Sequence, residues 1–137
     1  MEEARRDAGV SEEDLERIRA MNDAIGRADL QAIGELLDED VVWEHNPGVG
    51  SPEEGLYRGR EAVVRLFERI LEPWQYMRLE SVEVSELEHG GYLVKGEIRA
   101  KHRTSDLEVV TPYEQRLEIR DALLVRGRVT MEAAGVE

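Results

Sequence analysis

The residues best suited to chemistry lie in one short run, from Asp40 to Pro47. Alternate side chains of an extended backbone point to opposite faces, so Trp43 and His45 share one face of the strand that this run predicts. An imidazole can move a proton near neutral pH, and an indole supplies a large apolar wall beside it. If that face lies inward, the run predicts a proton-transfer group at a small-molecule pocket. The alternative is a strand-end histidine bonded to Asn46 or to a loop carbonyl.

Gln115 is the second candidate, because its amide interrupts an otherwise apolar row on a later strand. A buried amide must find hydrogen-bond partners, so Gln115 could bind a substrate, His45 or the backbone. Aromatic and other large apolar side chains offer walls for the same pocket, and we expect substrate contacts from six of them: Trp43, Tyr57, Trp74, Tyr113, Met21 and Phe67.

Three helices precede or interrupt the strands. Ser11 and Asp29 are typical N-caps, and they predict one helix after Ser11 and a shorter one after Asp29 that turns Leu36 and Leu37 inward. A third helix begins in the run Gly59-Arg-Glu61 and ends before Pro73. After it the apolar period changes from near 3.6 to near 2, which indicates strands.

Four strands are predicted in the second half, over 78–87, 92–104, 108–120 and 123–131, with a turn at His89-Gly90-Gly91. Helices followed by long antiparallel strands indicate an α+β fold, in which a curved sheet wraps three helices and leaves an open-ended cone. We expect a flexible segment at 1–10, one domain over 11–132 and a flexible tail at 133–137. The Gly- and Pro-rich run 48–55 is predicted to be a loop.

Composition excludes several classes of function. The formal charge of −13 argues against nucleic acid and anionic membranes as partners, since both require clustered Lys and Arg. The sequence has no cysteine and only three histidines in different elements, so we predict no metal site and no cofactor. No apolar run approaches a membrane span and the first ten residues are charged, so we expect a cytoplasmic protein.

Four segments, at Gly26–Leu30, Leu36–Glu44, Tyr57–Val63 and Arg120–Asp121, resemble the SnoaL-like branch of the nuclear transport factor 2-like superfamily. The resemblance covers residues 11–131 and implies three helices in the concave face of a strongly bent, mostly antiparallel sheet. It also implies a homodimer formed through the outer face of that sheet.

The resemblance places His45 where ketosteroid isomerases, a worked example of pKa tuning, hold their carboxylate base, and Gln115 near their oxygen-binding acid. Met21 occupies the position of their donor tyrosine, so steroid-type enolate stabilisation is not supported. We therefore predict a cofactor-independent isomerase, cyclase or dehydratase acting on a small hydrophobic molecule, with His45 and Gln115 as catalytic residues. The alternative is a non-catalytic ligand-binding or dimerisation domain of the same fold.

Overall fold

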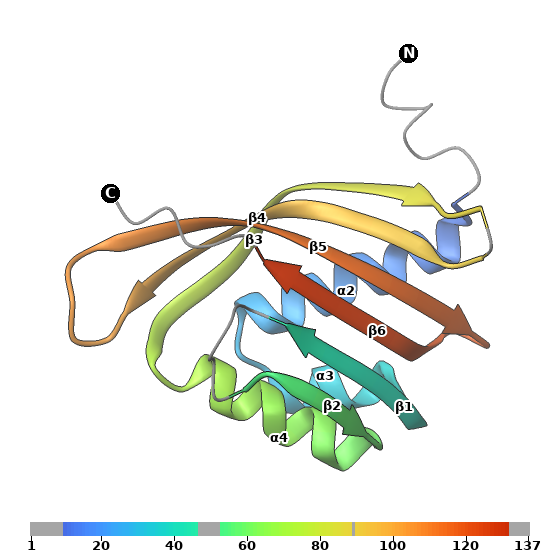
Figure 1. The fold of residues 1–137 in the computed structure, drawn as a ribbon, viewed down its shortest axis with the longest axis horizontal. Coiled ribbons are helices and arrows are strands. Elements are labelled where there is room, and N and C mark those ends of the chain that lie inside the picture. Colours follow the sequence, from blue (N-terminus) through green and yellow to red (C-terminus); the bar gives the residue numbers. More distant parts are fainter. Residues whose placement is uncertain (1–9, 47–52, 89, 132–137) are drawn as a thin grey trace.

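The computed structural model describes residues 10–46, 53–88 and 90–131. Three helices and six strands follow one another in these ranges (Figure 1). Their bounds, in chain order, are α2 Glu12–Gly26, α3 Leu30–Glu35, β1 Leu37–Asn46, β2 Gly55–Arg58, α4 Arg60–Leu71, β3 Trp74–Glu86, β4 Tyr92–His102, β5 Glu108–Arg120 and β6 Leu123–Met131.

The two predicted N-caps are confirmed. The Ser11 hydroxyl accepts a hydrogen bond from the Asp14 amide at 3.0 Å, and the Asp29 carboxylate accepts one from the Ala32 amide at 3.1 Å. Each bond satisfies a backbone donor that the first helical turn leaves free. The Tyr92 hydroxyl also donates to the Asp14 carboxylate at 2.5 Å and so ties the first turn of α2 to β4.

The six strands form one open sheet in the order β2-β1-β6-β5-β4-β3. All neighbours are antiparallel except β1 and β6, which are parallel. The pairing of β3 with β4 shifts register twice, between Trp74 and Tyr76 and between Glu80 and Glu83. Such irregularities increase local bending, and β3 follows a pronounced arc in Figure 1.

The helices cover one face of this sheet, where α2 packs against β3 and α4 packs against β1 (Figure 1). The opposite face is charged: Arg99, for example, contacts Glu80 at 2.9 Å and Glu108 at 2.7 Å. The predicted α+β class and curved sheet are therefore confirmed, and the predicted homodimer contact through the charged face stays a prediction. In the described parts of the chain, no helix is long and apolar enough to cross a membrane.

Two details of the predicted elements are wrong. Leu37 is not on the second helix, because the Leu36 amide closes a tight turn onto Ile33 and the Leu36 carbonyl accepts a sheet hydrogen bond from Leu124 at 2.9 Å. The second correction concerns β3, which begins at Trp74 and not at residue 78, because its first residues pair with the end of β4.

A short strand, β2, was not predicted at all, since its four residues carry no alternation long enough to be recognised. The expectations for the first nine residues, for 47–52 in the predicted loop, for His89 in the turn and for the tail at 133–137 fall outside the described residues.

Candidate active site

His45 lies near the end of β1, opposite Gly55 of β2 and Val129 of β6. Its side chain points to the helix-covered face, and the residue is only 4% exposed. The Nδ1 atom is buried and has no hydrogen-bond partner among the described residues. Burial lowers the pKa of His45 from 6.5 to about 4, because the charged ring loses its hydration. The imidazole is therefore neutral at pH 7 and can accept a proton there.

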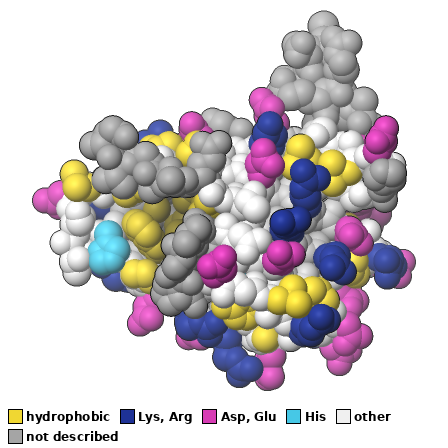
Figure 2. Space-filling model, viewed as in Figure 1, with side chains coloured by type: hydrophobic (Ala, Val, Ile, Leu, Met, Phe, Trp, Pro, Cys, Tyr) yellow, Lys and Arg dark blue, Asp and Glu magenta, His cyan; other side chains and the backbone are white. Residues whose placement is uncertain are grey.

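A cavity of about 370 Å³ opens beside His45 at the end of the molecule where β3, β4 and β5 bend over the helices. Hydrophobic side chains gather at this end of the surface, beside a histidine (Figure 2). The lining combines apolar residues with a few polar ones: His45, Glu53, Arg69, Ile70, Pro73, Trp74, Met77, Ile98, Ala100, His102, Val109, Thr111 and Met131. An apolar cavity with few polar groups is the usual form of a small-molecule site.

Trp74 and His102 form one side of this cavity at the paired ends of β3 and β4. Their rings meet edge to face, with centroids 5.5 Å apart and planes at 78°. On the α4 side, the Arg69 guanidinium lies over the Tyr57 ring at 5.8 Å from its centroid. The Tyr57 hydroxyl in turn donates to the Glu53 carbonyl at 2.8 Å. Tyr57 thus contacts two residues of the lining without being part of it.

Gln115 shares a cross-strand row with His45, because both residues pair with Val129 of the strand between them. Side chains two strands apart in a row are separated by roughly 10 Å at the backbone. Gln115 is 6% exposed and faces inward, but it does not line the cavity.

Tyr113 lies one row further along β5, with its ring against Gly96 of the neighbouring strand. It is 3% exposed, and its hydroxyl is buried without a hydrogen-bond partner in residues 10–46, 53–88 and 90–131. Burial raises the pKa of this hydroxyl to about 12, so it stays protonated and can donate. Tyr113 and Gln115 therefore form a buried polar layer adjacent to His45 but outside the cavity lining.

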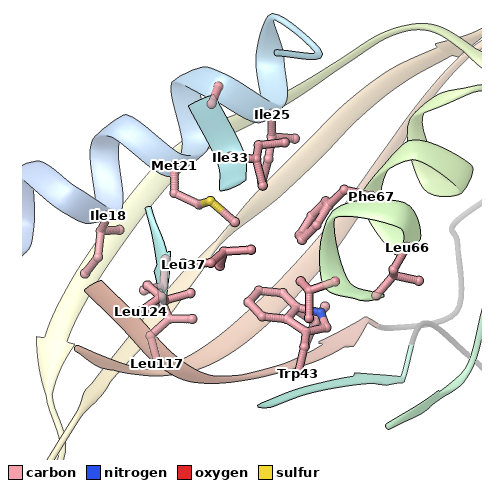
Figure 3. Close-up of a cluster of buried hydrophobic side chains, with 14 of the residues drawn as sticks. Ile18, Met21, Ile25, Ile33, Leu37, Trp43, Leu66, Phe67, Leu117 and Leu124 are labelled. Atoms are coloured by element: carbon pink, nitrogen blue, oxygen red, sulfur yellow. The ribbon is translucent and has the colours of Figure 1, made fainter. Parts of the chain in front are cut away.

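The other predicted contacts belong to the core. Trp43, Met21 and Phe67 are buried in the main hydrophobic cluster and do not line the cavity (Figure 3). The Trp43 and Phe67 rings meet edge to face with centroids 5.3 Å apart. Of the eight predicted site residues, the structure thus brings His45 and Trp74 to the cavity surface.

Sequence analysis did not assign His102, Arg69 and Met77 to the site. His102 ends the inward row of β4 and so carries a weak signal, but a residue at a strand end is often exposed to solvent. Arg69 and Met77 carry no pattern of their own, because only the bend of β3 brings them to one cavity. Among the described residues, no group of three or more His, Asp or Glu side chains could hold a metal ion.

Comparisons with known proteins place this geometry in a family. The model of the SnoaL-like domain matches residues 18–127. A comparison with curated proteins gives no match.

Three solved structures share the fold. A Bacillus subtilis protein provisionally named an isomerase is 19% identical, with a TM-score of 0.77 and coverage of 88% of this chain and 87% of that one. TerC, co-crystallised with polyporic acid, is 19% identical, with a TM-score of 0.75 and coverage of 88% and 92%. A Mycobacterium tuberculosis epoxide hydrolase of the LEH-like type is 16% identical, with a TM-score of 0.66 and coverage of 88% and 83%. The family match spans most of the sequence and agrees with the observed sheet and helices, so the chain belongs to the SnoaL-like family.

Proposed function

We propose that this protein is a cofactor-independent enzyme that binds a small, mostly hydrophobic organic molecule in the cavity and uses His45 to remove a proton from it. The supporting observation is a neutral, buried imidazole at the wall of an apolar cavity, whose Nδ1 has no partner in the described part of the chain. Isomerisation, aldol-type cyclisation and dehydration all begin with removal of a proton from carbon or oxygen. Each of these reactions fits one well-placed base.

The environment of His45 suits such a base. A pKa of about 4 gives the imidazole the strength of an ordinary carboxylate and leaves it unprotonated at pH 7. When it takes a proton from the substrate, the new imidazolium faces the carbanion or enolate that it has produced. That ion pair is stronger in an apolar cavity than in water.

Gln115 is proposed to hold an oxygen of the reacting molecule. Its side chain is buried in the same row as His45. The Tyr113 hydroxyl, one row away, is a second donor of this kind. A ligand that reaches these groups must displace Met131 or Val129, the side chains of β6 that lie between β1 and β5.

Names of similar structures agree with this class of reaction without identifying it. The Bacillus subtilis protein is provisionally named an isomerase, and TerC was co-crystallised with an organic acid. The mycobacterial protein is named an epoxide hydrolase, but here the inward row of β4 between Tyr92 and His102 is Val94, Gly96, Ile98 and Ala100, with no carboxylate or guanidinium to activate water. Epoxide hydration is therefore not proposed.

The base can be tested with 5-nitrobenzisoxazole, a small planar molecule that opens when a base removes its C3 proton and its N–O bond breaks. The phenolate product is measured by absorbance. We expect turnover by the wild-type protein, with kcat/KM about 100-fold lower in His45→Gln and unchanged in Glu61→Gln, on the exposed side of α4. The rate should be constant from pH 8 to 6 and fall as the pH approaches 4, since protonation of His45 removes the base. Equal rates in wild type and His45→Gln would refute the assignment.

A second candidate is binding without turnover. It is favoured by the position of Gln115, because only one member of the predicted catalytic pair reaches the cavity surface. In that case the wild-type protein would bind 5-nitrobenzisoxazole, and the rate of ring opening would not exceed that with an equal concentration of free imidazole.

A further inference from the structure

We propose that His102 is a specificity-determining residue of the cavity, and that it selects apolar ligands carrying a hydrogen-bond acceptor, such as a carbonyl oxygen, at the end remote from His45. This inference rests on the proposed small-molecule function of the cavity. It assigns a role to a residue that neither the family resemblance nor the proton-transfer step uses.

The contacts of His102 determine which ring nitrogen carries the proton. The backbone amide of Thr104 lies 3.2 Å from Nδ1, and the Thr104 hydroxyl lies 2.9 Å from the same atom. A backbone N–H can only donate, so Nδ1 must accept. In the neutral ring the proton is then on Nε2, and the hydroxyl of Thr104 can donate to Nδ1 as well. Thr104 thus holds His102 as a donor through Nε2.

The Nε2 donor has no acceptor within the described structure. No residue of 10–46, 53–88 or 90–131 accepts a hydrogen bond from Nε2 of His102. The ring is held edge to face against Trp74, so its orientation is set by packing as well as by Thr104. Both rings are part of the cavity lining, which is otherwise mainly apolar on this side. A ligand acceptor placed here would gain a hydrogen bond that the protein itself leaves unmade.

The sheet geometry explains why the two imidazoles serve different ends of one ligand. His45 is on β1 and His102 is at the far end of β4, three strands away and several residues further along the sheet. In a flat sheet their backbones would be about 30 Å apart. The bend of β3 and β4 brings both residues to one cavity, where His45 lines the wall from β1 and His102 lines it from β4. An elongated molecule can therefore present its reacting proton to His45 and its acceptor to His102.

Two matched probes test this assignment: 2-acetylnaphthalene, which carries a carbonyl, and 2-ethylnaphthalene, which has the same skeleton without it. Their dissociation constants can be measured by quenching of tryptophan fluorescence. His102→Phe keeps an aromatic ring against Trp74 but removes the donor. We expect this change to raise the dissociation constant of 2-acetylnaphthalene by about fivefold to tenfold and to change that of 2-ethylnaphthalene by less than about twofold. The proposal would be overturned if His102→Phe weakened the binding of both probes equally or left both affinities unchanged.

A second measurement does not depend on the folding of a variant. A long-range nitrogen–proton NMR spectrum of the wild-type protein should show His102 with its proton on Nε2, and the Nε2 resonance should shift when 2-acetylnaphthalene is added. A proton on Nδ1 would overturn the assignment. His45→Gln separates the two proposals, since it should lose ring opening of 5-nitrobenzisoxazole and keep the wild-type ratio of affinities for the two naphthalenes. If His102→Phe loses the wild-type ratio of affinities for the two naphthalenes but no turnover depends on His45, the proposed enzyme is refuted and the selectivity of His102 is retained.

Discussion

His45 and Tyr113 show the same physical feature at the residue scale: a polar side chain is buried without a partner. A buried polar atom that lacks a hydrogen bond destabilises the fold by about 1–3 kcal/mol. The Nδ1 atom of His45 and the hydroxyl of Tyr113 both carry this cost in the described structure. Groups that weaken the fold but remain ready to bind are typical of functional sites, where a ligand supplies the missing partner.

The burial of His45 should make stability depend on pH. In the unfolded chain its pKa is near 6.5, and in the folded protein it is about 4, so between these values the unfolded state binds a proton that the folded state does not. The contribution of neutral His45 is therefore complete above pH 6.5 and is lost as the pH falls towards 4. The loss amounts to about 3 kcal/mol in total.

Guanidinium unfolding at pH 7.0 and 4.5 measures this effect. Between these two values the wild type should lose roughly 2–3 kcal/mol more than His45→Gln, in which this position does not titrate. Other groups, such as Glu108 with its lowered pKa, titrate in both proteins and cancel in the comparison. If the two proteins lose equal stability, His45 is not buried in its neutral form.

Tyr113 and Tyr92 allow a matched test of the unpartnered hydroxyl. Tyr113→Phe removes a buried group without a partner and should stabilise the protein by about 1 kcal/mol. Tyr92→Phe removes a hydroxyl that donates to Asp14 and should destabilise it by about 1 kcal/mol. Thermal and urea unfolding of the two variants should thus change in opposite directions. A loss of stability in Tyr113→Phe would mean that its hydroxyl is already satisfied.

At the scale of elements, the packing of β1 on β6 depends on a missing side chain. Trp43 lies over Gly127, its cross-strand neighbour, and a Cβ atom at Gly127 would lie 2.3 Å from the indole ring. The indole has little room to move, because it is buried and also packs edge to face with Phe67 of α4. Glycine in a strand often marks such a close approach.

Gly127→Ala should therefore destabilise the protein by about 3 kcal/mol, the upper range for an overpacked core. Gly26→Ala is the control, because its Cβ would meet only the Met77 carbonyl at 3.8 Å and alanine favours the last turn of α2. We expect the control to be neutral or to gain up to about 1 kcal/mol in urea unfolding. A tolerated Gly127→Ala would show that the indole has room to shift.

The sequence predicted those elements whose signals are local. The caps at Ser11 and Asp29 and the bounds of β5 and β6 follow from neighbouring residues, and their positions are confirmed. Local pattern could not predict β2 or the early start of β3, because pairing with distant strands makes them. For the same reason local pattern identified His45 and Trp74 as site residues but not His102, which reaches the cavity through the bend of the sheet, or Arg69, which reaches it from α4.

At the scale of the whole molecule, the space between the helices and the sheet is filled at one end and hollow at the other. Around Trp43, Phe67 and Leu66, large side chains close the interior (Figure 3). Towards the paired ends of β3 and β4, about 370 Å³ remains open. The same inward rows line both regions, so the difference arises from side-chain size and from the bend of the strands and not from a change of fold.

Two alanines test this division. Ala100 of β4 lines the cavity, whereas Ala24 of α2 is fully buried in the core cluster. Ala100→Leu places its extra atoms in open space and should change the melting temperature by only about 3 °C. Because the leucine occupies the ligand's volume, it should also weaken the binding of 2-acetylnaphthalene more than about tenfold. Ala24→Leu adds the same atoms where no space exists and should destabilise the protein by about 1–3 kcal/mol, leaving the affinity of the folded fraction unchanged. Strong destabilisation by Ala100→Leu would mean that the hollow end is packed in solution, and a cavity for substrate would then have to be abandoned together with the role of His45.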